Sequence, residues 1–472
     1  MLKIVWSALL VLPTLLHAGD RYHVVFSKNL DTVSVEACYD GAPPEYLYRS
    51  DEAEPFVDYL LANGQPFDPP HRYGRMRVPE LPVNSCLKWQ VDLGRAAEAL
   101  SHRLALSAGD SYLSNGNLWF WRDDKRRNIQ IDVELPPGAA LSAPWQQLPQ
   151  DPDSDGTFLS FRPAATPASW TSRIAVGTFR VREIPVADSH LRLAVIGEVS
   201  EQQQQRFAQW IGETAVSVGA VYGKFPQPEA QVLVVPVGPQ REVVPWAHVI
   251  RGGGPAVEFF VDETLDLSSL REDWTATHEF SHLLLPAVSS ADRWLSEGLA
   301  SYYQSVLRAR DGRLSEREAW QKLHGGFQRG QAATRDGVDL AAATRGGWGN
   351  VMRVYWSGAA MMLKADTQLR MRSSGRQSLD SALANLQACC FDPGRSWSAR
   401  ELFAELDRLT GYHVFSNLYR EHVPDENFPD VGPVYDYLGL VAETGMVSLD
   451  HRAPGSRIRT SIMRLEEQLQ YD

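Results

Sequence analysis

The chain has 472 residues, of which 44% are hydrophobic, so it is long enough to bury more than one core, and we expect two or three domains. Its formal net charge is -12, with both signs interspersed along the sequence. This balance argues against a protein that binds nucleic acid by neutralising phosphates, and nothing in it indicates binding to an anionic membrane surface.

Residues 1–18 have the layout of a signal peptide. Lys3 precedes an apolar run from Ile4 to Leu16, and the small Ala18 stands before the polar Gly19. The run is shorter than the roughly 20 apolar residues of a transmembrane helix, and no later stretch approaches that length. We therefore expect an exported chain, periplasmic or secreted, without a membrane span in its mature form. An uncleaved anchor is the alternative, because Leu16 is larger than the usual residue beside a cleavage site.

The chain contains four cysteines, which fit an oxidising compartment. Cys38 and Cys86 could close a loop in the N-terminal region. The adjacent Cys389 and Cys390 have no nearby histidine and no C-x-x-C spacing, so we expect no metal role for them. They are predicted to be either buried thiols or oxidised to each other.

Residues 19–185 are predicted to form an all-β, sandwich-like domain. Short runs such as 22–26, 33–37 and 128–133 alternate between apolar and polar residues, and Pro- and Gly-rich turns such as 41–44 separate them. This pattern is typical of strands with one buried face.

The pattern changes after residue 185, and residues 186–312 are predicted to form a mixed catalytic domain. Strands are expected at Leu191–Ile196 and Gln231–Val237, and a long helix from Ser200 to Tyr222 lies between them.

Helical patterns dominate from Trp274 onward, and residues 313–472 are predicted to form a helical C-terminal domain that closes the cleft. The clearest of these patterns lie at 294–308, 315–324, 355–372 and 399–409. The predicted fold class is therefore a multidomain α+β protein.

An H-E-x-x-H motif runs from His278 to His282, in a helical segment that begins near Asp273 and ends near Pro286. Residues four apart lie one turn above each other on one face of a helix, so two imidazoles can bind one zinc ion at about 2.0–2.1 Å. Glu279 then lies beside the metal, where a carboxylate can accept a proton from the metal's water.

Glu297 is the candidate third ligand. It lies in a second helical pattern from Trp294 to Tyr303, which follows a short loop. Three protein ligands leave a fourth position for water, which is the arrangement of catalytic rather than structural zinc sites. In the alternative interpretation the two histidines are ordinary buried residues, and Glu279 and Glu297 are surface charges.

These residues resemble the gluzincin metallopeptidases, and within them the glycyl aminopeptidase family more closely than aminopeptidase N. Residues 294–303 are similar to the family's W-x-x-E-G-x-x-x-Y-Y segment, whose glutamate is the third zinc ligand. The resemblance covers about residues 191–438 and implies a thermolysin-like catalytic domain. Two features depart from the family. The interval 283–296 between His282 and the glutamate is short, and too few residues follow residue 440 for the family's PDZ module.

Residues 355–360 resemble the family segment whose tyrosine opens a later helix. The resemblance implies that the Tyr355 hydroxyl stabilises the tetrahedral oxyanion of the reaction. Ser357 takes the place of the family's usual lysine. The alternative is that Tyr355 is a core aromatic residue on an amphipathic helix.

Residues 252–259 resemble the glycine-rich edge strand, ending in glutamate, that lines the family's substrate cleft. The resemblance implies that Gly253 and Gly254 contact substrate and that Glu258 holds its free amino terminus. An ordinary glycine-rich turn is the alternative.

The sequence thus predicts a secreted zinc metallopeptidase with one zinc ion and a peptide substrate. The resemblance favours an aminopeptidase. A zinc endopeptidase, to which Glu258 would be dispensable, and a zinc-bearing binding protein with an idle site are the alternatives. The presence of Glu279 and Tyr355 argues against an idle site. His248 and Arg251 either line the cleft or lie on the surface.

Overall fold

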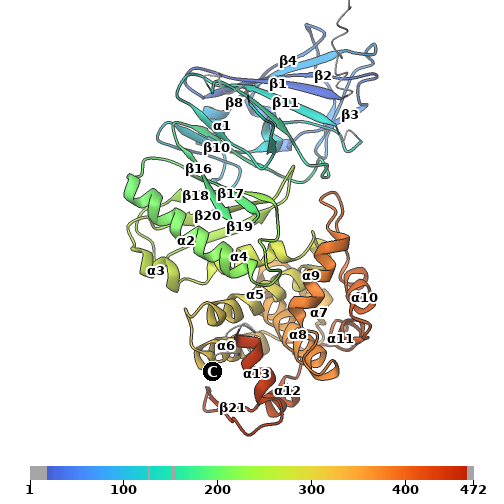
Figure 1. The fold of residues 1–472 in the computed structure, drawn as a ribbon. Helices are drawn as coiled ribbons and strands as arrows, with labels where there is room; N and C mark the ends of the chain where they lie inside the picture. Colours follow the sequence, from blue (N-terminus) through green and yellow to red (C-terminus); the bar gives the residue numbers. More distant parts are fainter. Residues whose placement is uncertain (1–18, 126–127, 151–155, 465–472) are drawn as a thin grey trace, which may run out of the picture.

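The computed structural model describes residues 19–125, 128–150 and 156–464, so the predicted signal peptide, residues 1–18, lies outside the described residues. Figure 1 shows three layers along the molecule: a β-rich N-terminal region, a mixed sheet beneath it, and a helical C-terminal region at the far end. None of the helices in the described ranges is long and apolar enough to cross a membrane.

The N-terminal region is built on an eight-stranded sheet with the order β13-β14-β11-β1-β2-β8-β4-β5. Alternate residues of β2 and β8 are buried, as the alternation in the sequence predicts. The strands of this sheet are β1 (Asp20–Phe26), β2 (Thr32–Cys38), β4 (Val57–Ala62), β5 (Gln65–Pro66), β8 (Cys86–Asp92), β11 (Ile129–Glu134), β13 (Gln146–Gln147) and β14 (Phe158–Arg162).

Two smaller sheets and three short helices complete this region. A four-stranded sheet has the order β12-β15-β10-β9, and a three-stranded sheet has the order β3-β7-β6. The remaining elements are β3 (Tyr46–Tyr48), η1 (Asp51–Phe56), β6 (His71–Arg72), β7 (Arg75–Arg77), α1 (Leu93–Ala99), β9 (Ala105–Ala108), β10 (Ser111–Asn115), η2 (Gly116–Leu118), β12 (Ala140–Ser142) and β15 (Arg173–Gly177).

Both cysteine pairs are oxidised. Cys38 and Cys86 are direct partners across β2 and β8 and form a disulfide, as predicted. Cys389 and Cys390 are bonded to each other at the end of a helix, which is one of the two states that the sequence left open.

A five-stranded mixed sheet lies at the centre of the molecule, with the order β16-β17-β18-β20-β19. The three inner strands are parallel to one another, and the edge strands β16 and β19 are antiparallel to their neighbours. The predicted domain boundary at residue 185 falls inside β16, which pairs with β17 in this sheet. Its strands are β16 (Val181–Val186), β17 (Ser189–Val195), β18 (Glu229–Pro236), β19 (Trp246–Ile250) and β20 (Ala256–Val261).

The two faces of the mixed sheet have different partners. Alternate residues such as Val257 and Phe259 pack against α2 (Glu201–Gly219) and the helical region. Residues on the opposite face, such as Leu233 and Phe260, pack against the four-stranded sheet of the N-terminal region through Leu113. Because side chains alternate between faces, Glu258 must point toward the N-terminal region, like Phe260.

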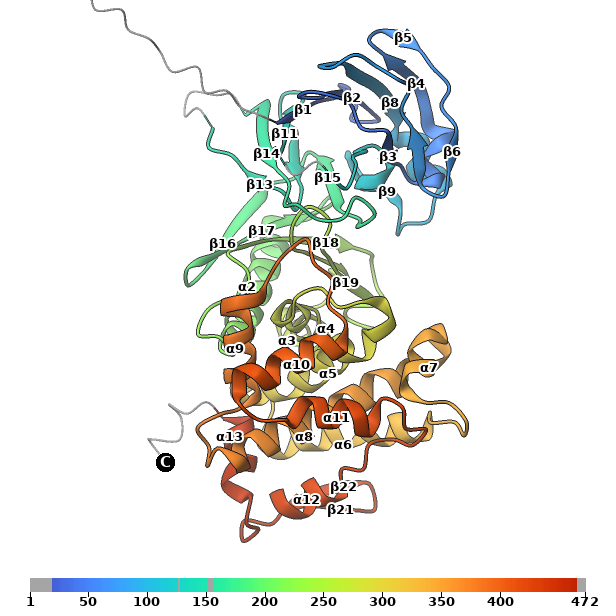
Figure 2. The same ribbon diagram turned by 90° about the vertical axis from the view of Figure 1, so that its right-hand side faces the viewer.

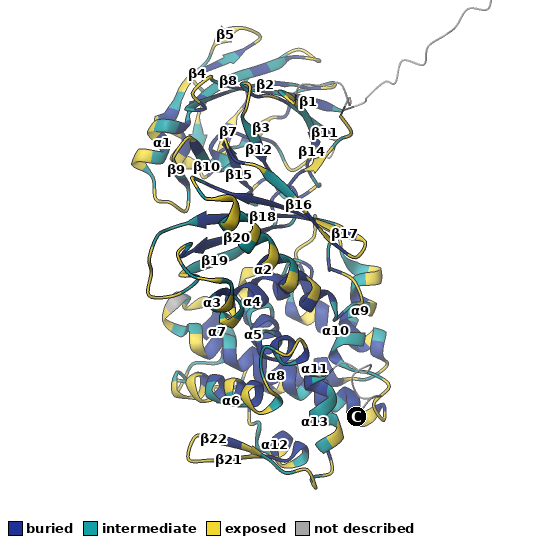
Figure 3. Cartoon of the chain, turned by 60° about the vertical axis from the view of Figure 1, so that its left-hand side comes forward, coloured by how far each residue is buried: buried dark blue, intermediate teal, exposed yellow. Residues whose placement is uncertain are grey.

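The helical region shares one continuous core with the mixed sheet, which extends from Ile184 to Met463. The predicted boundary at residue 312 therefore does not separate two hydrophobic cores. Figure 2 shows the helices stacked below the sheet, and Figure 3 shows their buried faces turned inward. These elements are α3 (Leu267–Glu272), α4 (Thr275–Ser281), η3 (His282–Leu284), η4 (Ser290–Asp292), α5 (Arg293–Arg310), α6 (Glu316–Ala332), α7 (Leu340–Arg345), η5 (Gly347–Asn350), α8 (Val351–Arg372), α9 (Leu379–Cys390), α10 (Ala399–Thr410), α11 (Val414–His422), α12 (Gly432–Leu438), β21 (Leu440–Glu443), β22 (Met446–Leu449) and α13 (Ser456–Met463).

Candidate active site

Three side chains converge on one point between α4 and α5. His278 and His282 lie one turn apart and are both buried. The Oε2 atom of Glu297 lies 3.3 Å from Nε2 of His278 and 3.5 Å from Nε2 of His282. Ligands held tetrahedrally at about 2.0–2.1 Å from one zinc ion are separated by about 3.4 Å. The two distances from Glu297 to the imidazole nitrogens therefore fit a zinc site.

Each histidine is held by a second hydrogen bond on the far side of its ring. Nδ1 of His278 lies 2.8 Å from Oε1 of Gln304, and Nδ1 of His282 lies 2.8 Å from Oγ of Ser296. An acceptor at Nδ1 fixes the tautomer that leaves the Nε2 lone pair free for metal. Neither Gln304 nor Ser296 was predicted from the sequence. The sequence feature that could have identified Gln304 is its position two turns after Glu297, on the same face of the same helix.

Glu279 is buried beside the two histidines, and its carboxylate and their ring nitrogens lie within 4.8 Å of one another. Burial raises the pKa of Glu279 to about 7, the nearby His278 lowers it, and the Glu297 carboxylate adds to the rise. A carboxyl group with a pKa near neutrality can both accept and donate a proton, as a general base and acid must.

Tyr355 of α8 completes the site. Its ring stacks on that of His278, with 5.9 Å between the ring centroids. Its hydroxyl is hydrogen-bonded to the Glu297 carboxylate. Burial raises the pKa of Glu297, but the charge of His282, the hydrogen bond and charge of His278 and the hydrogen bond from Tyr355 together lower it below its ordinary value. Burial raises the pKa of Tyr355, and the charges of Glu297 and Glu279 raise it further. The phenol therefore stays a neutral hydrogen-bond donor.

Two glycines bring Tyr355 close to Glu297. Gly298 of α5 faces Gly358 of α8, and a Cβ atom at Gly298 would lie only 2.3 Å from the Cα of Gly358. A Cβ at Gly358 would lie 2.1 Å from the carbonyl oxygen of Trp294. The two helices thus cross in direct backbone contact, which only glycine permits.

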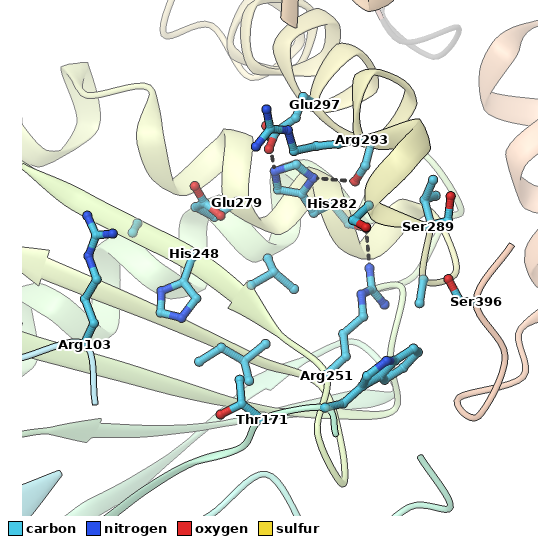
Figure 4. A pocket seen from close by; sticks show the side chains of 18 of the residues that line it. Arg103, Thr171, His248, Arg251, Glu279, His282, Ser289, Arg293, Glu297 and Ser396 are labelled. Atoms are coloured by element: carbon cyan, nitrogen blue, oxygen red, sulfur yellow. Dashed lines mark hydrogen bonds and ion pairs between the residues drawn. The ribbon is translucent and has the colours of Figure 1, made fainter. Parts of the chain in front are cut away.

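A cavity of about 890 Å³ lies between the mixed sheet and the helices, and Tyr355 is among the residues that line it. Glu279, His282 and Glu297 lie on its helical wall, and His248 and Arg251 lie on the opposite wall, formed by β19 and the residue after it (Figure 4). Other lining residues come from the N-terminal region, the start of α5 and the segment before α10, and they include Arg103, Thr171, Ser289, Arg293 and Ser396.

No family model matches the sequence, and no curated protein matches it. Solved structures do match. An aminopeptidase N family protein from Idiomarina loihiensis has a TM-score of 0.68 at 13% identity, over 90% of this chain and 79% of that one. An M1 zinc metallopeptidase from Deinococcus radiodurans has a TM-score of 0.54 at 15% identity, over 87% of this chain and 94% of that one. Yeast LTA4 hydrolase has a TM-score of 0.54 at 14% identity, over 84% and 66%.

The chain has the fold of the M1 zinc metallopeptidases. The predicted fold class is therefore confirmed: β-sheets at the N-terminus, a mixed catalytic sheet and a helical C-terminal part. The strand wall of the cavity in this M1 fold differs from the one predicted from the sequence.

The predicted edge strand of the M1 fold is an interior strand here. Glu258 lies in β20, which pairs on one side with β18 and on the other with β19. The edge strand that lines the cavity is β19, residues Trp246–Ile250. The placement of Glu258 in an edge strand was therefore wrong, because its position in the sheet depends on pairing with a strand that the sequence does not reveal.

Glu258 does not reach the cavity. Its side chain is 0% exposed, and its Oε1 accepts hydrogen bonds from Nη2 and Nε of Arg173 at 2.8 and 3.0 Å. This geometry contradicts the predicted role of Glu258 in holding a substrate amino group. The ion pair instead joins β20 of the M1-type sheet to β15 of the N-terminal region.

Gly253 and Gly254 are also buried against the N-terminal region rather than exposed to substrate. A Cβ atom at Gly253 would lie 2.8 Å from the Trp145 ring, and one at Gly254 would lie 1.8 Å from the carbonyl oxygen of Pro144. The Gly253 amide donates to the Thr166 hydroxyl over 2.8 Å. The predicted substrate contacts of these glycines are therefore wrong; the turn needs glycine because it docks two parts of the fold.

Proposed function

We propose that this chain is a zinc-dependent peptidase that hydrolyses peptide bonds. The observation that carries the proposal is the position of Glu297 at zinc-ligand spacing from both His278 and His282, with Glu279 and Tyr355 beside them at the cavity. One zinc ion fits this donor set of two imidazoles and one carboxylate. The M1 fold supports the same conclusion.

Zinc held there would supply a water of lowered pKa and polarise the carbonyl of the scissile bond. Glu279 accepts a proton from the attacking water and passes it to the departing nitrogen. Tyr355 donates a hydrogen bond to the carbonyl oxygen as negative charge develops on it. The water oxygen bonds to the carbonyl carbon, the C–N bond breaks, and the products are a carboxylate and an amine.

The substrate we propose is an extended peptide. The edge strand β19 lines the cavity and pairs on its inner side with β20, so its outer side can hydrogen-bond a peptide backbone. A variant of the Deinococcus enzyme has been solved with a Tyr-Ser-Ala substrate, which is a peptide of this kind.

Cleavage at the amino terminus, implied by the resemblance, has support in the aminopeptidase N family protein that shares the fold. The burial of Glu258 removes the residue that would have held the amine, and this favours endopeptidase cleavage as the second candidate.

The test is mass-spectrometric profiling of a mixed peptide library with the zinc-loaded protein and its E279Q variant. We expect E279Q to cut about 10²- to 10⁴-fold more slowly, the usual contribution of a general base, with zinc content unchanged. E443Q, at an exposed residue of β21, is the matched control and should retain full activity. If the native protein leaves every peptide intact, the idle zinc-binding alternative replaces the proposal.

We further propose that the chain is exported. The supporting features are the signal-like sequence of residues 1–18 and the disulfide between Cys38 and Cys86, which fits an oxidising compartment. A mature protein recovered from an oxidising compartment and beginning near Gly19 would support this; a cytoplasmic protein with reduced cysteines would contradict it.

A further inference from the structure

The strand wall of the cavity is cationic. Arg103 and Arg251 lie on this wall with His248, and Arg293 lines the helical side of the cavity at the start of α5. Within residues 19–125, 128–150 and 156–464, the only carboxylates that line it are Glu279 and Glu297, which the reaction itself requires. A substrate ammonium group therefore meets no additional carboxylate among the described residues.

Arg251 lies directly after the edge strand, near the end of the metal-binding helix. Its Nη2 donates to the carbonyl oxygens of His282 and Leu285 over 2.8 and 3.1 Å (Figure 4). Within the part of the chain that the structure describes, no carboxylate lies within ion-pair distance of Arg251. The guanidinium carries five N–H donors and keeps its positive charge, so it retains donors for a ligand in the cavity.

Arg103 enters the cavity from the N-terminal region. It is exposed, and its guanidinium lies 5.3 Å from the centre of the Trp246 ring, on the strand wall. The backbone that carries it is held by Arg173, whose Nη1 donates to the carbonyl oxygens of Arg103 and Leu104 at 3.0 and 3.3 Å. Because Glu258 fixes Arg173, the buried ion pair also positions Arg103.

His248 adds no charge of either sign near neutral pH. Burial, together with the charges of Arg173 and Arg103, lowers the pKa of His248 to about 3, so its ring is neutral. Its Nδ1 lies 3.5 Å from Oε2 of Glu258, beneath the cavity wall. The electrostatic field at the strand wall is therefore set by Arg103 and Arg251.

We propose that the cavity selects peptides with a carboxylate near the scissile bond, bound by Arg103, while Arg251 adds positive charge at the other side of the same wall (Figure 4), and that cleavage requires no free amino terminus. This inference rests on the proposed peptidase function and names its substrate class. The carboxylate can come from an aspartate or glutamate side chain or from the peptide's C-terminus. Arginine is suited to either source because its planar donor pair matches a carboxylate.

The first experiment compares matched peptides with the zinc-loaded protein. The pairs differ in one group: Glu against Gln beside the scissile bond, a free against an acetylated amino terminus, and a free against an amidated C-terminus. We expect the carboxylate in one of the two acidic pairs to raise kcat/KM by about 10- to 100-fold, the range of hydrogen bonds to a charged group. Which pair responds identifies the source of the carboxylate. N-acetylation should leave the rate unchanged.

Variants then connect this preference to the arginines. R103Q should reduce the ratio of acidic to neutral kcat/KM, and because Arg103 is exposed the substitution should leave the fold intact. R72Q, at an exposed residue of β6, is the matched control and should keep the ratio. Equal rates for acidic and neutral peptides, or loss of cleavage on N-acetylation, would overturn the inference while the peptidase function stands.

A binding experiment separates this inference from the proposed function. Calorimetry with the E279Q variant measures the affinities of the same peptides without hydrolysis. Tighter binding of the acidic peptide by E279Q, together with a native protein that cuts nothing, supports carboxylate recognition and contradicts the peptidase proposal. Equal affinities of the acidic and neutral peptides contradict the recognition itself.

Discussion

The helical wall of the cavity and its strand wall are built in different ways. The helical wall is supported from within: Gln304 and Ser296 hold the histidines, and the close crossing at Gly298 places α8 against α5. The strand wall depends on a separate region, because Arg173 and the docked glycine turn fix it to the N-terminal sheets. In the proposed function, the helical wall carries the chemistry and the strand wall selects the substrate.

Among the substitutions that test the difference between the two walls, E258Q is expected to have the largest effect, a loss of stability. It leaves the buried Arg173 without its counter-charge, which costs about 3–5 kcal/mol of unfolding free energy. Urea denaturation measures the loss, and E443Q is the control, since Glu443 is exposed. If E258Q has unchanged stability but a raised KM, Glu258 binds substrate and the structural role is wrong.

A smaller effect is expected from G298A on the helical wall. The added methyl group overlaps the backbone of Gly358, which costs about 1–3 kcal/mol and separates Tyr355 from Glu297, so kcat should fall. The comparison is G325A in α6, where the nearest atom to a new Cβ is the flexible Arg329 side chain at 3.6 Å. Thermal unfolding and kcat are the measurements. If G298A behaves like G325A, the close crossing does not hold the site.

The smallest effect is expected from Q304A, which removes the hydrogen-bond acceptor at Nδ1 of His278. We expect zinc affinity to fall by about 10- to 100-fold with little change in fold stability, since loss of such outer hydrogen bonds has this effect. Competition with a chelator measures the affinity. The exposed Q209A in α2 serves as the control. Equal affinities would show that the His278 ring needs no support from α5.

The same contrast explains which features the sequence could predict. His278, Glu279 and His282 lie within one helix, so helical periodicity predicts that they share one site. Glu297 was the candidate third ligand on the next helix, and the resemblance supported it. Tyr355 came from the resemblance, and the structure brings it to the same point. The α+β fold class was also predictable, because long periodic segments define its elements.

The strand wall could not be predicted in the same way. Whether β20 is an edge or an interior strand depends on its pairing with β19, and the partner of Glu258 is Arg173, 85 residues earlier. The glycine run looked like a substrate strand because the steric demand that selects glycine, contact with Trp145 and Pro144, comes from another region. The periodicity of a sequence shows which face of a helix or strand is buried, but it does not show which distant helix or strand packs against that face.

The mixed sheet has one further consequence, for any attempt to produce the catalytic part alone. A fragment beginning at β16 would lose the four-stranded sheet that covers Leu233, Val235 and Phe260. These neighbouring side chains would then form an apolar surface open to water, which favours aggregation. The N-terminal region is thus expected to act as a built-in solubility factor for the catalytic half, and the two should be expressed as a single polypeptide.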